Sequence, residues 1–252
     1  MKQLESNNSM IINSEIKGIG LSPTHLDSDT TRLKALITID LYYTFDLFKK
    51  NGPTDVDQLL AVFVPTAVHE IGHYWCCYSF PPLMIGAHYS TATDLFSDSM
   101  TYSDPMGYSR WIKDNNGNMA CVNKNKDTAI FKFSKLSLYL MGLVSKSEVT
   151  PIEYNNYKKS DAYGYIGPYC GDVVEWLNTI TYTTEDLIRL TGEREPSSET
   201  SERSFSVGYI ILGDENSSEE KDFVELVKLL GNQLTDAWKN ATDNLSSLVN
   251  SY

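Results

Sequence analysis

The segment His69-Glu70-Ile71-Gly72-His73 constrains this chain most, because it carries the pattern H-E-x-x-H. Four residues along an α-helix make slightly more than one turn, so the two imidazoles share a face and can bind one Zn²⁺ together. Glu70 can then reach a water molecule bound to the metal. The chain has 4 histidines, and two of them are in this motif. We therefore predict a zinc site with His69 and His73 as ligands.

The residues before the motif predict where its helix begins. Pro65 should end the preceding element, and Thr66 can then cap a new helix from Ala67. The apolar run Leu59–Val64 suits either a buried strand or a buried helical turn. As a strand at a sheet edge, it could pair with an extended peptide. Gly72 costs about 1 kcal/mol of helix propensity relative to Ala, which suggests that another chain segment passes close to it.

A catalytic zinc ion usually has three protein ligands and a fourth position for water. The sequence offers two candidates for the third ligand, His88 and Asp94. His88 is favoured because a neutral imidazole is a preferred zinc donor, and it would complete a three-histidine site. Asp94 would give a site of two histidines and one carboxylate, although such residues more often cap or solvate loops.

Charge and hydropathy exclude some partners. The net charge is −12 and the pI is near 4.7, which argues against nucleic acid, because phosphate binding needs clustered Lys and Arg. No run approaches the ~18 apolar residues of a transmembrane helix. The N-terminal stretch lacks the apolar core of a signal peptide. We expect a cytoplasmic protein, a chain that begins after its export signal, or export by another route.

The cysteines leave the redox compartment open. Cys76 and Cys77 are adjacent and should point in different directions, so neither fits a metal knuckle. A Cys121–Cys170 disulfide is one possible pairing, and buried free thiols are an equally good reading.

The remaining pattern predicts a single α+β domain. Residues 1–16 are polar and are expected to form a flexible N-terminal segment, followed by one domain over residues 17–252. We expect a mixed sheet, a central zinc-binding helix and a long C-terminal helix. Other predicted elements are a hairpin turn at Asp114–Asn118, a helix over Leu136–Met141 capped by Ser134, a helix between Thr183 and Gly192, a strand at Phe205–Leu212, and a helix from Ser217 with an apolar stripe to Leu248.

Two resemblances add to this reading. Asp104-Pro105-Met106-Gly107-Tyr108 resembles the Met-turn of metzincin peptidases, in which a methionine lies under the metal. In astacin-like members a tyrosine two residues later stabilises the oxyanion, and this implies that role for Tyr108. The chain departs from metzincins after His73, where their compact third-histidine motif is absent.

The chain also resembles a group of prokaryotic predicted zinc metallopeptidases over roughly residues 60–212. The shared elements are H-E-x-G-H-x-W, a histidine followed by an aromatic residue and serine, and Y-L-M-G-L. They correspond here to His69–Trp75, His88–Ser90 and Tyr139–Leu143, and the second implies His88 as the third ligand.

Together these features predict a zincin-like endopeptidase that acts on a peptide or protein substrate. His69, His73 and His88 would hold Zn²⁺, and Glu70 would act as the general base. The alternative is a zinc-binding structural or adhesion module without activity. A purely structural site needs no carboxylate at Glu70 and usually has more cysteine ligands.

Overall fold

The computed structural model describes residues 8–25, 32–39, 56–78, 80–96, 102–107, 111–113, 115–121, 130–158, 168, 172, 174–210 and 220–251. Over these residues the chain is a mixture of helices and small β-sheets, which confirms the predicted α+β class. The chain divides into two compact units. The first comprises residues 1–10, 37–71 and 202–252, and the second comprises residues 11–36 and 72–201.

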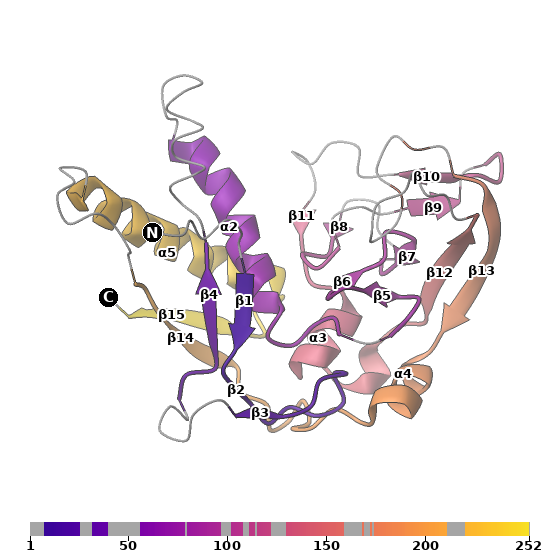
Figure 1. The fold of residues 1–252 in the computed structure, drawn as a ribbon, viewed down its shortest axis with the longest axis horizontal. Coiled ribbons are helices and arrows are strands. Elements are labelled where there is room, and N and C mark those ends of the chain that lie inside the picture. The colour runs from indigo at the N-terminus through magenta and orange to yellow at the C-terminus, as the bar shows by residue number, and fades with distance from the viewer. Residues whose placement is uncertain are drawn as a thin grey trace. The chain divides into compact units, whose positions relative to one another are not determined.

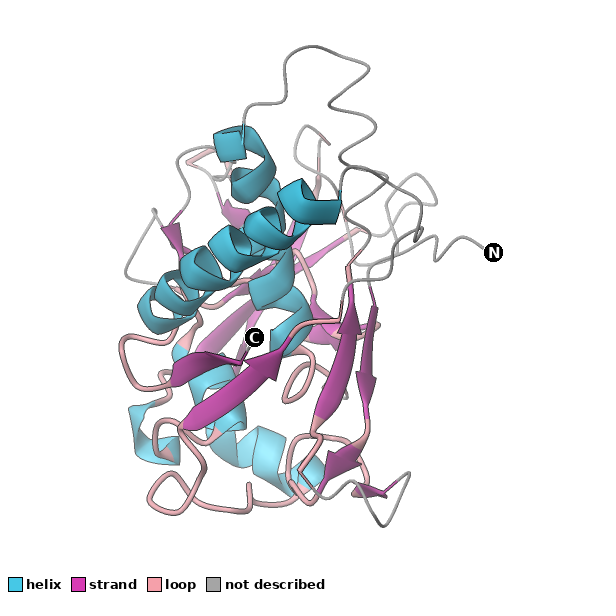
Figure 2. Ribbon diagram, turned by 90° about the vertical axis from the view of Figure 1, so that its left-hand side faces the viewer, coloured by secondary structure: helices cyan, strands magenta, loops and turns pink. Residues whose placement is uncertain are grey.

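The first unit is built on two helices, α2 (Val56–Gly72) and α5 (Glu220–Ala241). Phe63 of α2 and Leu230 of α5 are buried in one hydrophobic cluster, and Leu60, Val64, Leu226 and Ile39 pack against it. Two parallel strands, β14 (Ser204–Gly208) and β15 (Ser247–Ser251), complete this unit. Figure 2 shows α5 beside this strand pair.

The helix α2 corrects the prediction that Pro65 ends one element and Thr66 begins another. The apolar run Leu59–Val64 is helical, so it is not a sheet edge, and Pro65 lies inside the helix. Proline has no N–H to give to the preceding turn. The Thr66 hydroxyl does not cap a new helix, since it donates to the carbonyl of Val62 at 2.8 Å. Packing of Phe63 against α5 helps to outweigh the local preference to stop.

The helix α5 is shorter than its apolar stripe predicted. It ends at Ala241, and Leu248 lies in β15. The backbone at Asp243 and Asn244 has positive φ angles of 55° and 62°. This left-handed conformation, which Asp and Asn tolerate better than most residues, turns the chain back toward β14.

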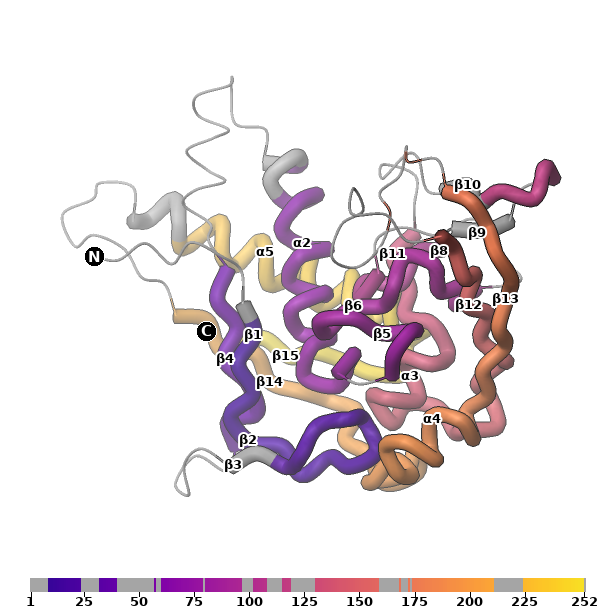
Figure 3. Tube along the Cα trace, turned by 45° about the vertical axis from the view of Figure 1, so that its right-hand side comes forward, coloured from indigo at the N-terminus to yellow at the C-terminus, as the bar shows by residue number. Residues whose placement is uncertain are grey.

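The second unit consists of short strands and two short helices (Figure 1). Its largest sheet has the order β13-β12-β7, all antiparallel. Figure 3 shows the hairpin of β5 (Met84–Ile85) and β6 (His88–Tyr89) within this unit. The strands are β2 (Asn13–Ser14), β3 (Thr24–His25), β5 (Met84–Ile85), β6 (His88–Tyr89), β7 (Thr93–Asp94), β8 (Tyr102–Ser103), β9 (Trp111–Lys113), β10 (Met119–Cys121), β11 (Ile130–Phe131), β12 (Ile152–Tyr157) and β13 (Trp176–Tyr182).

The local signals for turns and caps were accurate in this unit. The helix α3 (Lys135–Met141) has Ser134 as its N-cap, and α4 (Thr184–Thr191) begins after Thr183, where Thr183 and Asp186 form a capping box. Of the turn predicted at Asp114–Asn118, residues 115–118 are described and lie between β9 and β10, whereas Asp114 lies outside the described residues. The 3₁₀ helix η2 (Lys146–Glu148) follows α3. Ser217 lies outside the described residues, so its predicted capping role is not seen.

Two larger predictions differ from the structure. Part of the segment expected to be flexible forms strands, since β1 (Asn8–Ile11) pairs with β4 (Ala35–Thr38) and β2 pairs with β3. The described strands form several separate two- and three-stranded sheets in place of one mixed sheet. Short strands interrupted by loops carry little periodicity, so the sequence gives no signal for how they pair.

Among the described residues, each helix is too short or too polar to cross a bilayer.

The packing of α5 generates a stability prediction. Trp238 is fully buried, and its indole N–H donates to Ser246 Oγ at 3.0 Å. Trp238→Ala should lower the free energy of unfolding by about 3–5 kcal/mol, since it removes a large buried side chain. Urea unfolding measures this loss. The control is Leu229→Ala on the same helix, where the side chain is 39% exposed. It should change the free energy of unfolding by only about 0.5 kcal/mol. Equal losses in the two variants would contradict the burial of Trp238.

Candidate metal centre

Three histidines from two neighbouring segments come together. His69 lies in the last turn of α2, His73 directly follows that helix, and His88 begins β6. Their candidate ligand atoms all lie within 4.8 Å of one another. A tetrahedral zinc ion with Zn–N distances of about 2.1 Å spaces its nitrogens by about 3.4 Å. Small side-chain movements would therefore close this group around a metal ion.

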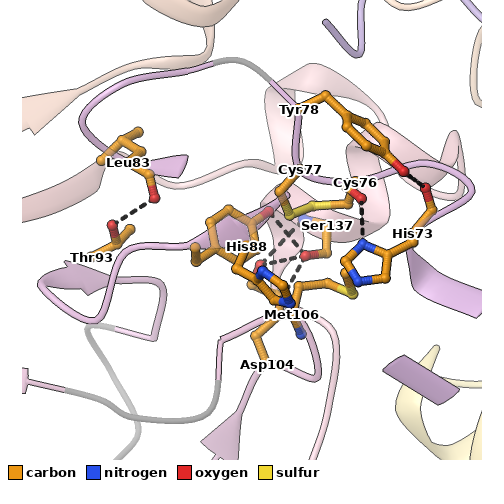
Figure 4. The surroundings of a disulfide bond; sticks show 12 residues. His73, Cys76, Cys77, Tyr78, Leu83, His88, Thr93, Asp104, Met106 and Ser137 are labelled. Atoms are coloured by element: carbon orange, nitrogen blue, oxygen red, sulfur yellow. Dashed lines mark hydrogen bonds between the residues drawn. A yellow bond between two sulfur atoms is a disulfide. The ribbon is translucent and has the colours of Figure 1, made fainter. Parts of the chain in front are cut away.

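The rings of His73 and His88 meet edge to face. Their centroids are 5.0 Å apart and their planes cross at 87°. Figure 4 shows the two rings pointing toward one another. His69 and His73 are buried and His88 is half-buried. One side of the group is therefore closer to solvent, as a site that admits a ligand requires.

Backbone carbonyls orient two of the rings. The Nδ1 atom of His73 lies 3.3 Å from the carbonyl oxygen of Cys76, and Nδ1 of His88 lies 2.8 Å from that of Gly86. A carbonyl only accepts, so Nδ1 carries the hydrogen in each contact. In a neutral ring Nε2 is then the unprotonated nitrogen, which is the form that coordinates a metal.

The tight turn before His88 brings it to this position. Gly86 and Ala87 connect β5 to β6, and both have positive φ angles, 58° and 65°. Two successive residues with positive φ are typical of the type I′ hairpin turn. The turn reverses the chain so that His88 and the carbonyl of Gly86 lie within hydrogen-bonding distance.

Burial sets the protonation of His73 and Glu70. Burial, together with the nearby charge of His88, lowers the pKa of His73 to about 4. The ring is therefore neutral at pH 7 and ready to accept a metal. Burial also raises the pKa of Glu70 above its usual range. A carboxylate shifted toward neutrality is a stronger base than an exposed one.

The second candidate ligand is not part of this group. Asp94 is buried in β7, and its Oδ1 accepts a hydrogen bond from the backbone N–H of Phe96 at 3.1 Å. Among the described residues, the group that could hold a metal contains the three histidines alone. Tyr108 lies outside the described residues, so its predicted role in stabilising an oxyanion stays a prediction.

Met106 packs against the end of the motif helix. A Cβ atom added to Gly72 would lie 2.5 Å from Met106 Sδ, so only glycine allows this approach. Figure 4 shows the Met106 side chain reaching toward the His73 ring. Met106 is fully buried. The close approach predicted at Gly72 is therefore confirmed, and Met106 is the residue that makes it. A place for Met106 under a metal, which the metzincin resemblance implies, stays a prediction.

The pairing of Cys76 and Cys77 was missed. The sequence reading had the two side chains pointing apart, whereas the structure joins them in a disulfide. Both are buried, and the carbonyl of Cys76 is the one that holds His73. Tyr78 adds a second local contact, since its hydroxyl donates to the carbonyl of His73. Adjacency of two cysteines was the available signal. Cys170 and the side chain of Cys121 lie outside the described part of the chain.

Comparisons with known proteins add no family to this geometry. No model of a protein family matches the chain, and no match was found among curated proteins or solved structures. The two resemblances stated from the sequence therefore stay predictions.

The low pKa of His73 predicts how the metal-free protein responds to pH. Its folded pKa of about 4 lies below the ordinary value of 6.5. This group's contribution to stability is therefore complete above pH 6.5, is lost progressively as the pH falls below 6.5, and is gone once the pH has fallen through about 4. The loss should be at most about 3 kcal/mol. Urea unfolding with a chelator at pH 7.5 and pH 4.5 measures it.

The matched variant for that experiment is His73→Gln. It should flatten the pH dependence, because glutamine does not titrate. The raised pKa of Glu70 acts in the opposite direction and is common to both proteins. An equally steep dependence in the variant would assign the effect to other groups.

The disulfide predicts a chemical result. When the protein is unfolded and alkylated without reductant, Cys76 and Cys77 should stay unmodified, since their sulfurs are bonded to each other. Peptide mapping by mass spectrometry reports this. Prior treatment with dithiothreitol should allow both to be alkylated. Modification of either residue without reductant would contradict the disulfide.

Proposed function

We propose that this protein is a zinc-dependent peptidase that hydrolyses peptide bonds in peptide or protein substrates. The observation that carries the proposal is the convergence of His69, His73 and His88, with Glu70 directly after the first of them. Three imidazoles and an adjacent carboxylate are the set of groups that metal-assisted hydrolysis requires.

The donor set fits zinc. Imidazole nitrogen is a preferred zinc donor, whereas calcium and magnesium prefer oxygen. Three protein donors leave one of zinc's four positions for water or substrate. A bound zinc ion would lower the pKa of that water toward neutrality and polarise the scissile carbonyl.

Glu70 supplies the proton transfer. As general base it takes a proton from the attacking water, and as general acid it returns that proton to the leaving amine. Its raised pKa suits both steps, because a base too weak to take the proton or too strong to return it would slow one of them. The carboxylate is buried, and Glu70 directly follows His69 on the same helix.

The cysteines support a catalytic site over a structural one. Structural zinc sites are closed by four ligands, usually with cysteine among them. Cys76 and Cys77 lie near His73, but each sulfur is bonded to the other, so neither is a thiolate that could fill the fourth position.

The test combines zinc content with hydrolysis. Purified protein should contain about one equivalent of zinc and should cleave casein. Glu70→Gln should keep the zinc and lose at least about 100-fold in rate, because it removes the base and leaves the ligands. Elemental analysis and a casein assay measure the two quantities.

Glu175→Gln is the matched control. Glu175 is an exposed glutamate paired with Lys158 at 3.1 Å, so the same substitution there should change neither zinc content nor rate. Zinc without cleavage would identify a structural or adhesion module. Absence of zinc would overturn the peptidase proposal and the module together.

A further inference from the structure

A buried carboxylate holds the turn that carries Met106. Asp104 follows β8 and is 2% exposed. Its Oδ1 accepts from the backbone N–H of Met106 at 2.9 Å. Its Oδ2 accepts from the backbone N–H of Ser134 at 2.7 Å and from the Ser137 hydroxyl at 2.7 Å. Burial raises the pKa of Asp104, and these three hydrogen bonds oppose that rise.

The turn held by Asp104 contacts both segments that carry histidines. On one side, the carbonyl of Met106 accepts from the backbone N–H of Tyr89, the residue after His88, at 3.0 Å. On the other side, Met106 Sδ lies against Gly72, the residue before His73. One turn is therefore in contact with the immediate neighbours of two of the three histidines.

A second route reaches the same strand through Ser137. The Tyr89 hydroxyl lies 3.0 Å from Ser137 Oγ, which in turn donates to Asp104. Tyr89 and Ser137 are buried. Asp104 thus fixes Tyr89 at its backbone through Met106 and at the end of its side chain through Ser137.

We propose that Asp104 is a positioning residue that sets the separation between His73 and His88, and with it the affinity of the site for a divalent metal. The inference rests on the proposed metal site. A carboxylate is needed because donors approach both of its oxygens. Asparagine has the same shape but one acceptor oxygen, so its NH₂ group would face at least one donor.

The decisive measurement is metal affinity in the intact chain. Zn²⁺ binding is measured by competition with a chromophoric chelator, and Co²⁺ is used in its place for the visible absorption spectrum. Asp104→Asn should bind Zn²⁺ about 10–100-fold more weakly, as is usual when a group supporting metal ligands is lost. Its Co²⁺ spectrum at saturation should also change, because the ligand geometry has moved.

Two further variants give the comparison its controls. Ser137→Ala removes one of the three donors to Asp104, so it should weaken Zn²⁺ binding less than Asp104→Asn does. If Asp104→Asn does not fold, Ser137→Ala still tests the proposal. Asp186→Asn makes the same change at a carboxylate that accepts from the backbone N–H of Thr183 at the start of α4. It should leave Zn²⁺ affinity within about 2-fold of the wild type.

The outcomes separate this inference from the proposed function. Wild-type affinity and an unchanged Co²⁺ spectrum in a less stable Asp104→Asn protein would show a purely structural role and overturn the inference alone. If the wild-type protein binds zinc but does not cleave casein, the peptidase proposal is overturned. The Zn²⁺ affinity of Asp104→Asn then still decides the positioning role of Asp104. A wild-type protein without zinc overturns both.

Discussion

The spacing of two imidazoles along one helix is the constraint from which the candidate site follows. Because His69 in the last turn of α2 and His73 just after it are four residues apart, both rings reach one point, and the rest of the site has to meet them there. The β5–β6 turn brings His88, and the Met106 turn closes the other side against Gly72. The helix sets the direction of His69 and His73, and the two loops set how far His88 and Met106 lie from them.

The sequence predicted those parts whose signals are local. The motif, the caps at Ser134 and Thr183 and the hairpin turn before β10 each depend on a few neighbouring residues, and all appear in the structure. The choice of His88 over Asp94 rested on donor chemistry and agrees with the described group of histidines. Donor chemistry depends on residue type and is therefore visible in the sequence, whereas bound metal stays a prediction.

Features that depend on packing between distant parts of the chain were predicted less accurately from the sequence. Pro65 was taken as a stop, but the chain around it is helical and Phe63 packs against α5. The apolar stripe past Ala241 suggested more helix, where two residues with positive φ turn the chain into a strand. The Cys76–Cys77 disulfide had the adjacency of the two residues as its only signal. The hydrogen bonds of Asp104 to Ser134 and Ser137 join residues 30 and 33 positions apart, so no local pattern encodes them.

The contact between Gly72 and Met106 has a consequence for how such a chain can diverge. The thioether occupies the space that a side chain at position 72 would need, so the two positions share one volume. A methyl group gained at 72 would have to be matched by a shorter residue at 106, and the new residue would have to keep its carbonyl facing Tyr89. Among homologous sequences these two sites should therefore covary, although 34 positions separate them along the chain.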